Sequence, residues 1–205
     1  MKTIYLILVT TVILSACGTG SNTSRNSANG EIKKGITPIA DTEIAVIEMD
    51  NPAYGTINME LYSNIAPKAV ARFKELAKEG FYNGVTFHRI NASVIQSGDP
   101  LSKDDNPAND GTGKSDKPNV PAEFSDILYD TGIVGAARGQ DNNSANSQFF
   151  ITLKRESGFD QKYTIFGKVI EGMNNVMTIS GVQPKQGERP VEPIRIKTIR
   201  IEPKQ

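Results

Sequence analysis

Short runs of hydrophobic or alternating hydrophobic and polar residues recur along the chain from about residue 41 onward. Residues 43–49 and 56–61 form two such runs around Asn51-Pro52 and Gly55, a pattern typical of a β-hairpin. Gly, Pro, Asn and Asp separate the later runs, at 85–90, 94–96, 132–137, 148–153, 164–170 and 194–201. So many short strands favour a closed β-barrel.

Two helices are predicted to interrupt the strands. Pro67 can occupy the first position of a helix that Gly80 terminates. Between them runs an apolar stripe with spacings of three and four, formed by Val70, Phe73, Leu76 and Ala77. A second helix is expected from Met173 to Ile179. No internal repeat of 20 to 50 residues is visible, which argues against a solenoid or propeller.

The first residues have the pattern of a secretory signal. Met1-Lys2 precedes an almost wholly apolar run at 4–14, which is too short to span a bilayer comfortably as a helix. Leu14-Ser15-Ala16-Cys17 resembles the bacterial lipobox, which implies cleavage before Cys17 and lipidation of its thiol. An ordinary signal peptide with an incidental Cys17 is the alternative.

A lipobox implies a domain order and a location. We expect a lipoprotein signal peptide at 1–16, a lipidated Cys17 with a flexible tether to residue 40, and a globular domain at 41–205. The tether is predicted because residues 19–40 are rich in Gly, Ser, Asn and Thr and contain few large apolar side chains. The protein would then lie in a bacterial cell envelope and face the periplasm or exterior, touching the membrane through its lipid anchor only.

The composition excludes several classes of site. A single Cys cannot form an intramolecular disulfide, and one Cys with one His cannot build the usual zinc site. The chain has 23 basic and 23 acidic residues, of which residues 1–40 carry four and one, so 19 basic and 22 acidic remain in the domain. This balance gives no support to nucleic-acid binding. We expect a monomer without metal or cofactor.

One motif is misleading. Residues 108–115 read Ala-Asn-Asp-Gly-Thr-Gly-Lys-Ser, close to a phosphate-binding loop. That mechanism needs a buried strand before the loop and a helix after it, whereas polar residues precede this stretch and Pro118 and Pro121 follow it. Ala108 also occupies a position where a calcium loop requires an oxygen ligand. We therefore interpret the stretch as a solvated loop.

Four motifs together resemble the cyclophilin family of peptidyl-prolyl cis-trans isomerases. They are Phe87-His88-Arg89-Ile90, Gln96-Ser97-Gly98-Asp99-Pro100, Asn146-Ser147-Gln148-Phe149-Phe150-Ile151 and Ile165-Phe166-Gly167-Lys168-Val169. The resemblance covers essentially all of residues 41–202. It implies a mostly β fold, an eight-stranded antiparallel barrel closed at its ends by two helices, and proline-containing polypeptides as substrates.

The resemblance also assigns roles to residues. Arg89 would face the prolyl nitrogen, Gln96 would orient Arg89 and contact the substrate carbonyl, and Phe150 would form the floor of a proline socket. Phe149 and Phe150 point to opposite faces of a strand, so Phe149 is assigned to the core. The other substrate-binding positions are Ser93, Val94, Gly111, Ala137, Arg138, Gln148, Phe159 and Tyr163. His88, the sole histidine, is interpreted as structural because the reaction needs no proton transfer.

Some positions depart from the family pattern. The run after Arg89 is one residue short, so that Ser93 replaces an aromatic platform beside the socket. Gly158 and Tyr163 replace a Trp and a His that many eukaryotic members carry, and the loop at 100–110 is longer than usual. We expect weak binding of cyclosporin. The leading hypothesis is an isomerase that assists the folding of exported proteins, and the alternative is a catalytically weak chaperone module that binds proline peptides at the cell envelope.

Overall fold

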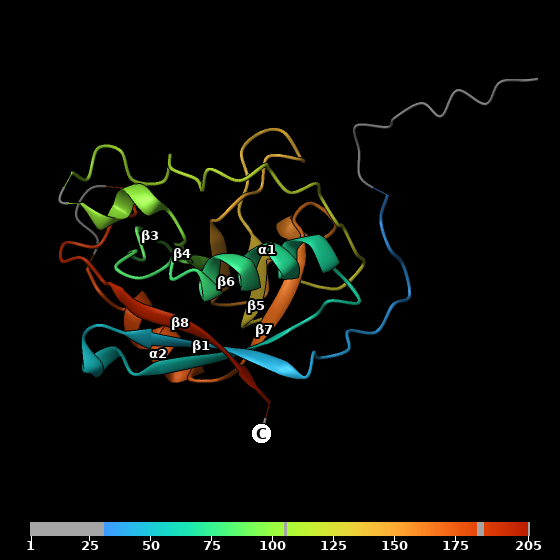
Figure 1. Ribbon diagram of the computed structural model, residues 1–205, viewed down its shortest axis with the longest axis horizontal. Coiled ribbons are helices and arrows are strands. Elements are labelled where there is room, and N and C mark those ends of the chain that lie inside the picture. Colours follow the sequence, from blue (N-terminus) through green and yellow to red (C-terminus); the bar gives the residue numbers. More distant parts are fainter. Residues whose placement is uncertain (1–30, 105, 184–186, 205) are drawn as a thin grey trace, which may run out of the picture.

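The computed structural model describes residues 31–104, 106–183 and 187–204, which form a strongly curved sheet with two α-helices (Figure 1). The strands are β1 (Glu43–Met49), β2 (Thr56–Leu61), β3 (Arg89–Ile90), β4 (Val94–Ser97), β5 (Ile133–Ala136), β6 (Phe149–Thr152), β7 (Ile165–Glu171) and β8 (Ile196–Pro203). The helices are α1 (Pro67–Lys78) and α2 (Met173–Ser180), with short 3-10 turns η1 (Pro52–Tyr54), η2 (Pro100–Lys103) and η3 (Ser157–Phe159). The predicted hairpin and both predicted helices are confirmed.

The eight strands form one sheet in the order β3-β4-β6-β5-β7-β2-β1-β8, and every neighbouring pair is antiparallel. The prediction of a closed barrel is wrong, because in the described part of the chain no ladder joins β3 to β8. These edges approach each other through one isolated bridge between Thr86 and Arg195 and a few hydrogen bonds, such as Phe87 N to Ile194 O at 2.9 Å. The sheet is therefore an open half-barrel.

The composition of the two edges explains why the ladder stops. β3 contains only two residues, and the segment that faces it before β8 includes Pro190 and Pro193. Proline has no backbone N–H to donate, so a regular ladder cannot continue through these positions. The two edges meet along what we call the seam, defined by residues 84–87 and 194–196.

Both helices pack against the sheet. α1 contacts β7 and β8, and its predicted apolar stripe is buried. Gly80 adopts φ 69° just after α1, a left-handed conformation that glycine tolerates best and that ends the helix. α2 contacts β2 and β4. Phe73 of α1 lies among the rings of Tyr82, Phe149 and Phe166, at centroid distances of 5.3–5.5 Å.

The apolar interior has two parts. The larger cluster lies between α1, α2 and the sheet, and it includes Phe73 and Phe149. The smaller cluster lies under β4, β5 and β6 and contains Tyr62, Ile65, Val94, Tyr129, Ile133, Phe150 and Ile165. The smaller cluster supports the candidate active site, because Val94 and Phe150 belong to both.

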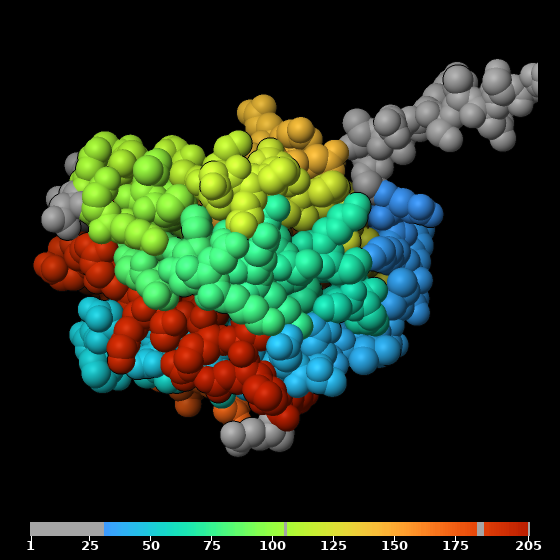
Figure 2. Space-filling model, in the orientation of Figure 1, coloured from blue at the N-terminus to red at the C-terminus, as the bar shows by residue number. Residues whose placement is uncertain are grey.

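Residues 33–39, which the sequence analysis assigns to a flexible tether, are instead held against the domain. Lys33 N donates to Phe124 O at 2.9 Å, and Lys33 Nζ donates to Ile65 O at 2.6 Å. The Asn64 side chain bonds both Ile39 N (3.0 Å) and Thr37 O (2.9 Å). In Figure 2 this blue segment covers one side of the domain.

The predicted signal peptide, Cys17 and the first part of the tether lie outside the described residues. Within the described ranges, no helix combines the length and the hydrophobicity that a transmembrane segment requires.

The N-terminus of α1 receives its carboxylate from a distant part of the chain. Ala66, at the N-cap, offers no side-chain hydrogen bond. Instead, the carboxylate of Glu123 accepts from Lys68 N and Ala69 N, both at 3.0 Å, and the Glu123 residue is only 7% exposed. A buried carboxylate at this end also interacts favourably with the helix dipole.

We predict that Glu123→Ala lowers the free energy of unfolding by about 1–3 kcal/mol, because it removes hydrogen bonds to a charged group and leaves two buried donors unpaired. Glu123→Gln keeps an acceptor and should cost less. Urea unfolding of the full chain followed by circular dichroism measures both, with Glu192→Ala at an exposed position as the control. If Glu123→Ala were as stable as the control, the proposed capping role would be wrong.

Candidate active site

Strand pairing places four residues of the candidate site in one row across the sheet. Arg89 of β3 pairs with Gln96 of β4, and Gln96 pairs with Phe150 of β6. Phe150 in turn pairs with Gly135 of β5. Directly paired residues project from the same face of a sheet, so three side chains emerge side by side next to a glycine.

The glycine in this row makes room for the Phe150 ring. A Cβ atom on Gly135 would overlap the ring of Phe150 and would lie 2.6 Å from the hydroxyl of Tyr129. The ring of Tyr129 stacks against Phe150, with centroids 5.7 Å apart and planes inclined by 25°. Both aromatic residues are buried. Gly135 and Tyr129 therefore fix the position of Phe150.

Two further aromatic rings complete an apolar socket above Phe150. Phe159, in η3, and Tyr163 each meet the Phe150 ring edge-on, with centroids 5.6 Å away. The socket has a volume of about 350 Å³ with its open mouth included. Eight of the predicted site residues line it: Arg89, Val94, Gln96, Ala137, Arg138, Phe150, Phe159 and Tyr163.

A chain of polar side chains links the socket to a second hollow. Arg89 Nη1 donates to Gln96 Oε1 at 3.2 Å, and Gln96 Nε2 donates to Gln148 Oε1 at 2.9 Å. Gln148 Nε2 then donates to the carbonyls of Gly111 (3.1 Å) and Gly113 (2.8 Å). Each amide thus has a defined orientation.

The second hollow adjoins the socket, and the two share Gln96, Ala137 and Arg138 in their linings. Gln148 and Gly111, both predicted as substrate-binding residues, line the second hollow rather than the socket. The two hollows form a continuous groove that fits an extended peptide better than a compact ligand. We call this surface the groove below.

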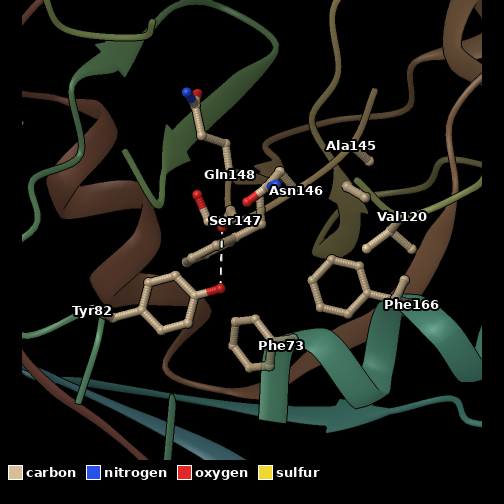
Figure 3. Close-up of a pocket in the computed structure, with 11 residues that line it drawn as sticks. Phe73, Tyr82, Val120, Ala145, Asn146, Ser147, Gln148 and Phe166 are labelled. Atoms are coloured by element: carbon tan, nitrogen blue, oxygen red, sulfur yellow. Dashed lines mark hydrogen bonds between the residues drawn. The ribbon is translucent and has the colours of Figure 1, made fainter. Parts of the chain in front are cut away.

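Successive residues of β6 point to opposite sides, as predicted. Behind this strand lies a small internal cavity lined by Phe73, Tyr82 and Phe166, where the Tyr82 hydroxyl donates to Ser147 O at 3.1 Å (Figure 3). In Figure 3 the Gln148 side chain points away from these rings. Phe149 packs in the larger cluster and Phe150 in the smaller one, which confirms the assignment of Phe149 to the core.

Arg138 forms part of the groove wall through its side chain. Its guanidinium lies 4.7 Å from the centre of the Tyr163 ring, within the range of a cation–π interaction. Nη2 donates to Lys162 O at 2.9 Å and Nη1 donates to Gly139 O at 2.8 Å. These bonds hold Arg138 against Tyr163 and stiffen the rim.

Ser93 is the predicted site residue that the structure places outside the groove. Its hydroxyl donates to Glu156 Oε1 at 2.6 Å, and Ser93 is absent from the linings of the socket and the second hollow. The cause is a tight turn in which the Asn91 side chain accepts from the N–H groups of Ser93 and Val94, at 2.8 and 2.9 Å. This turn presents Val94, rather than Ser93, to the socket.

His88 is buried, and neither ring nitrogen has a hydrogen-bond partner among the described residues. Burial lowers the pKa of His88 below its usual value, against an opposing effect of Asp99. A neutral imidazole next to Arg89 fits the structural role expected from the sequence. Across the ranges that the structure describes, no group of three His, Cys, Asp or Glu side chains converges as metal ligands do.

The loop at 100–115 is ordered by Asp99. The Asp99 carboxylate accepts from Leu101 N at 2.8 Å and also from Gly111 N. No helix follows the stretch 108–115 among the described residues up to β5, so the interpretation against a phosphate-binding loop is confirmed.

Sequence reasoning missed two residues at the groove. Tyr129 lies under Phe150, but it occurs in a segment without clear periodicity. Glu188 forms an ion pair with Arg89, although 98 residues separate the two in the sequence. No local pattern signals either contact, because both depend on how distant segments meet.

An apolar socket of this size beside a fixed arginine, opening into a longer groove, defines a protein that binds extended peptides with a compact apolar residue at one position. Residues 44–201 match the family described as cyclophilin type peptidyl-prolyl cis-trans isomerase/CLD. This match covers more than half of the chain, and the chain belongs to this cyclophilin-type family.

Individual relatives agree with this assignment. The chain is 46% identical over 127 residues to a probable peptidyl-prolyl cis-trans isomerase of Brucella suis, covering 60% of this chain and 65%, just under two thirds, of the Brucella protein. It is 37% identical over 149 residues to a peptidyl-prolyl cis-trans isomerase of Schizosaccharomyces pombe, covering 69% of this chain and 90% of the yeast protein.

Solved structures show the same fold. A cyclophilin type peptidyl-prolyl cis-trans isomerase of Cryptosporidium parvum superposes with a TM-score of 0.71 at 28% identity, covering 80% of this chain and 99% of the other. A second structure of that protein, determined in the presence of the dipeptide Ala-Pro, has a TM-score of 0.70 at 29% identity and covers 78% and 99% of the two chains.

We predict that Gly135→Ala displaces the Phe150 ring and lowers the free energy of unfolding by about 1–3 kcal/mol, the usual cost of overpacking. Gly158→Ala is the matched control, since a Cβ there would meet no atom within 4 Å. Denaturant unfolding measures the stability, and the aromatic NMR signals of Phe150 report the ring displacement. Equal stability of the two variants would contradict the tight fit at Gly135.

Proposed function

We propose that this protein is a peptidyl-prolyl cis-trans isomerase that catalyses rotation about X-Pro bonds in polypeptides. The observation that carries the proposal is the position of Arg89, which Gln96 holds at the edge of a socket with Phe150 as its floor. Membership of the cyclophilin-type family and the names of the relatives support the same activity.

The reaction makes and breaks no covalent bond. Rotation must overcome the amide resonance, with a barrier of about 20 kcal/mol. As the bond twists, the prolyl nitrogen becomes pyramidal and its lone pair can accept a hydrogen bond. A donor that acts only on this twisted state lowers the barrier.

The residues of the groove meet these needs. The socket binds the proline ring through apolar contacts with Val94, Phe150 and Phe159, and the neighbouring hollow holds the flanking backbone. Arg89 Nη2 has no hydrogen-bond partner in the part of the chain that the structure describes, so it is free to donate to the prolyl nitrogen. A guanidinium suits this task because it remains charged and its donors are held in a rigid plane.

We predict that Arg89→Ala lowers kcat/KM by about 100-fold or more, the effect typical of removing one donor to a transition state. Arg89→Lys should recover only part of the activity, because an ammonium group cannot bond Gln96 and the prolyl nitrogen in the same geometry. A protease-coupled assay with a proline peptide measures the rates. Arg200→Ala, on β8, serves as the control, and an Arg89→Ala protein as fast as wild type would refute the role of Arg89.

A catalytically weak chaperone module that binds proline peptides is the second candidate. One observation favours it, because Ser93 points to Glu156 and leaves the socket without an aromatic platform from the β3–β4 turn. NMR exchange spectroscopy separates the two functions. Peptide-induced shifts near Phe150 without exchange between the cis and trans signals of the peptide would support binding alone.

We further propose that the protein is exported and is anchored to a bacterial membrane through a lipid on Cys17, with exported proteins as its clients. The lipobox-like sequence and the short apolar run before it support this location. The similarity to Brucella proteins is consistent with a bacterial origin. One or more acyl chains on Cys17 would provide the membrane attachment.

We predict that the wild-type chain, expressed in a bacterium, incorporates radiolabelled fatty acid and fractionates with membranes, whereas Cys17→Ser does neither because it lacks the thiol. Globomycin, which blocks cleavage of lipoprotein signals, should cause the unprocessed wild-type protein to accumulate. An unlabelled wild-type protein released in soluble form would rule out the lipid anchor.

A further inference from the structure

The segment before β8 reaches across the edge of the sheet to the residues of β3. Glu188, in this segment, accepts a hydrogen bond from Arg89 Nε and forms an ion pair with that guanidinium. Its second carboxylate oxygen accepts from Asn91 Nδ2 at 2.7 Å, and its backbone carbonyl accepts from Ile90 N at 2.6 Å. Glu188 thus contacts three consecutive residues at the start of the groove.

The contact with Glu188 gives the Arg89 guanidinium a second fixed point. Nε is held by Glu188, and Nη1 is held by Gln96. Because a guanidinium is planar, two fixed nitrogens determine the direction of the third. We propose that Glu188 is a positioning residue for Arg89, which orients Nη2 toward the prolyl nitrogen in the isomerisation proposed above.

Glu188 differs from an ordinary surface partner, which contributes little because two mobile side chains must be held in one geometry. Here the carboxylate is fixed by Asn91, and Asn91 in turn bonds the N–H groups of Ser93 and Val94. One network therefore connects Glu188 to the turn that places Val94 in the socket wall. Burial opposes ionisation of Glu188, but the hydrogen bonds from Asn91 and Arg89 outweigh it and lower its pKa, so the carboxylate is charged at neutral pH.

The opposite role, an inhibitory contact that withholds Arg89 from the substrate, fits the geometry less well. Glu188 lines a hollow on the outer side of Arg89, together with His88 and Asp110, but it is absent from the lining of the socket. Its bond uses Nε and leaves Nη2 without a partner among the described residues. The ion pair therefore leaves both the socket and the donor accessible.

The test compares Glu188→Ala and Glu188→Gln with wild type in the isomerase assay on the full chain. Glu188→Ala should lower kcat by about tenfold with little change in KM, because misorientation of a catalytic group weakens transition-state contacts more than ground-state binding. Glu188→Gln can still accept from Nε and donate to no competing group in the socket, so it should restore part of kcat. Glu192→Ala, at an exposed position of the same segment, should match wild type.

A spectroscopic measurement accompanies the kinetics. The Arg89 Nε–H signal in a ¹⁵N NMR spectrum should be protected from exchange in wild type, weaker in Glu188→Gln, and lost to exchange in Glu188→Ala. A merely structural role for Glu188 would lower the free energy of unfolding without changing kcat of the folded protein, so urea unfolding of each variant identifies that case.

The outcomes are distinct. A lower kcat with a lost Nε–H signal supports the positioning role. Glu188→Ala with unchanged kcat overturns it, and Glu188→Ala with raised kcat overturns it in favour of an inhibitory contact. An inactive wild-type protein would instead refute the proposed isomerase function itself, and the positioning role with it.

Discussion

The register of the antiparallel sheet is the constraint on which the site depends. It places Arg89, Gln96, Phe150 and Gly135 opposite one another on four strands, although these residues span 61 positions of the chain. A slip of one residue in any of these pairs would turn a side chain to the other face of the sheet. The donor and the floor of the socket thus have their relative positions fixed by backbone hydrogen bonds, before any side chain packs.

Packing then makes this arrangement rigid. Phe150 fits over Gly135 and against Tyr129, so the floor of the socket is part of the smaller apolar cluster rather than a mobile surface ring. The polar side of the groove is fixed in a different way, through the hydrogen bonds that run from Arg89 to Gln96 and Gln148. A groove with so little freedom loses little entropy when a peptide binds, which leaves more of the binding energy for the twisted amide.

Much of the fold follows from local patterns, and the exceptions share a cause. The strands, both helices and the opposite faces of Phe149 and Phe150 could be predicted because alternation and helical spacing act over a few residues. The closed barrel, the tether at 33–39 and the groove position of Ser93 were not predicted correctly. Each depends on where distant segments meet: at prolines beside the seam, at the surface around Asn64, or at Glu156. Glu188 escaped notice for the same reason.

The seam also separates two kinds of failure on heating. Across it, residues 84–87 and 194–196 are joined by few hydrogen bonds, whereas the other strand pairs form ladders. Regions with sparse backbone bonding open locally at a lower free energy than the whole fold. Opening here would carry Glu188 away from Arg89 while α1 and the larger cluster remain packed. The temperature at which the groove loses its arrangement therefore need not be the temperature at which the domain melts.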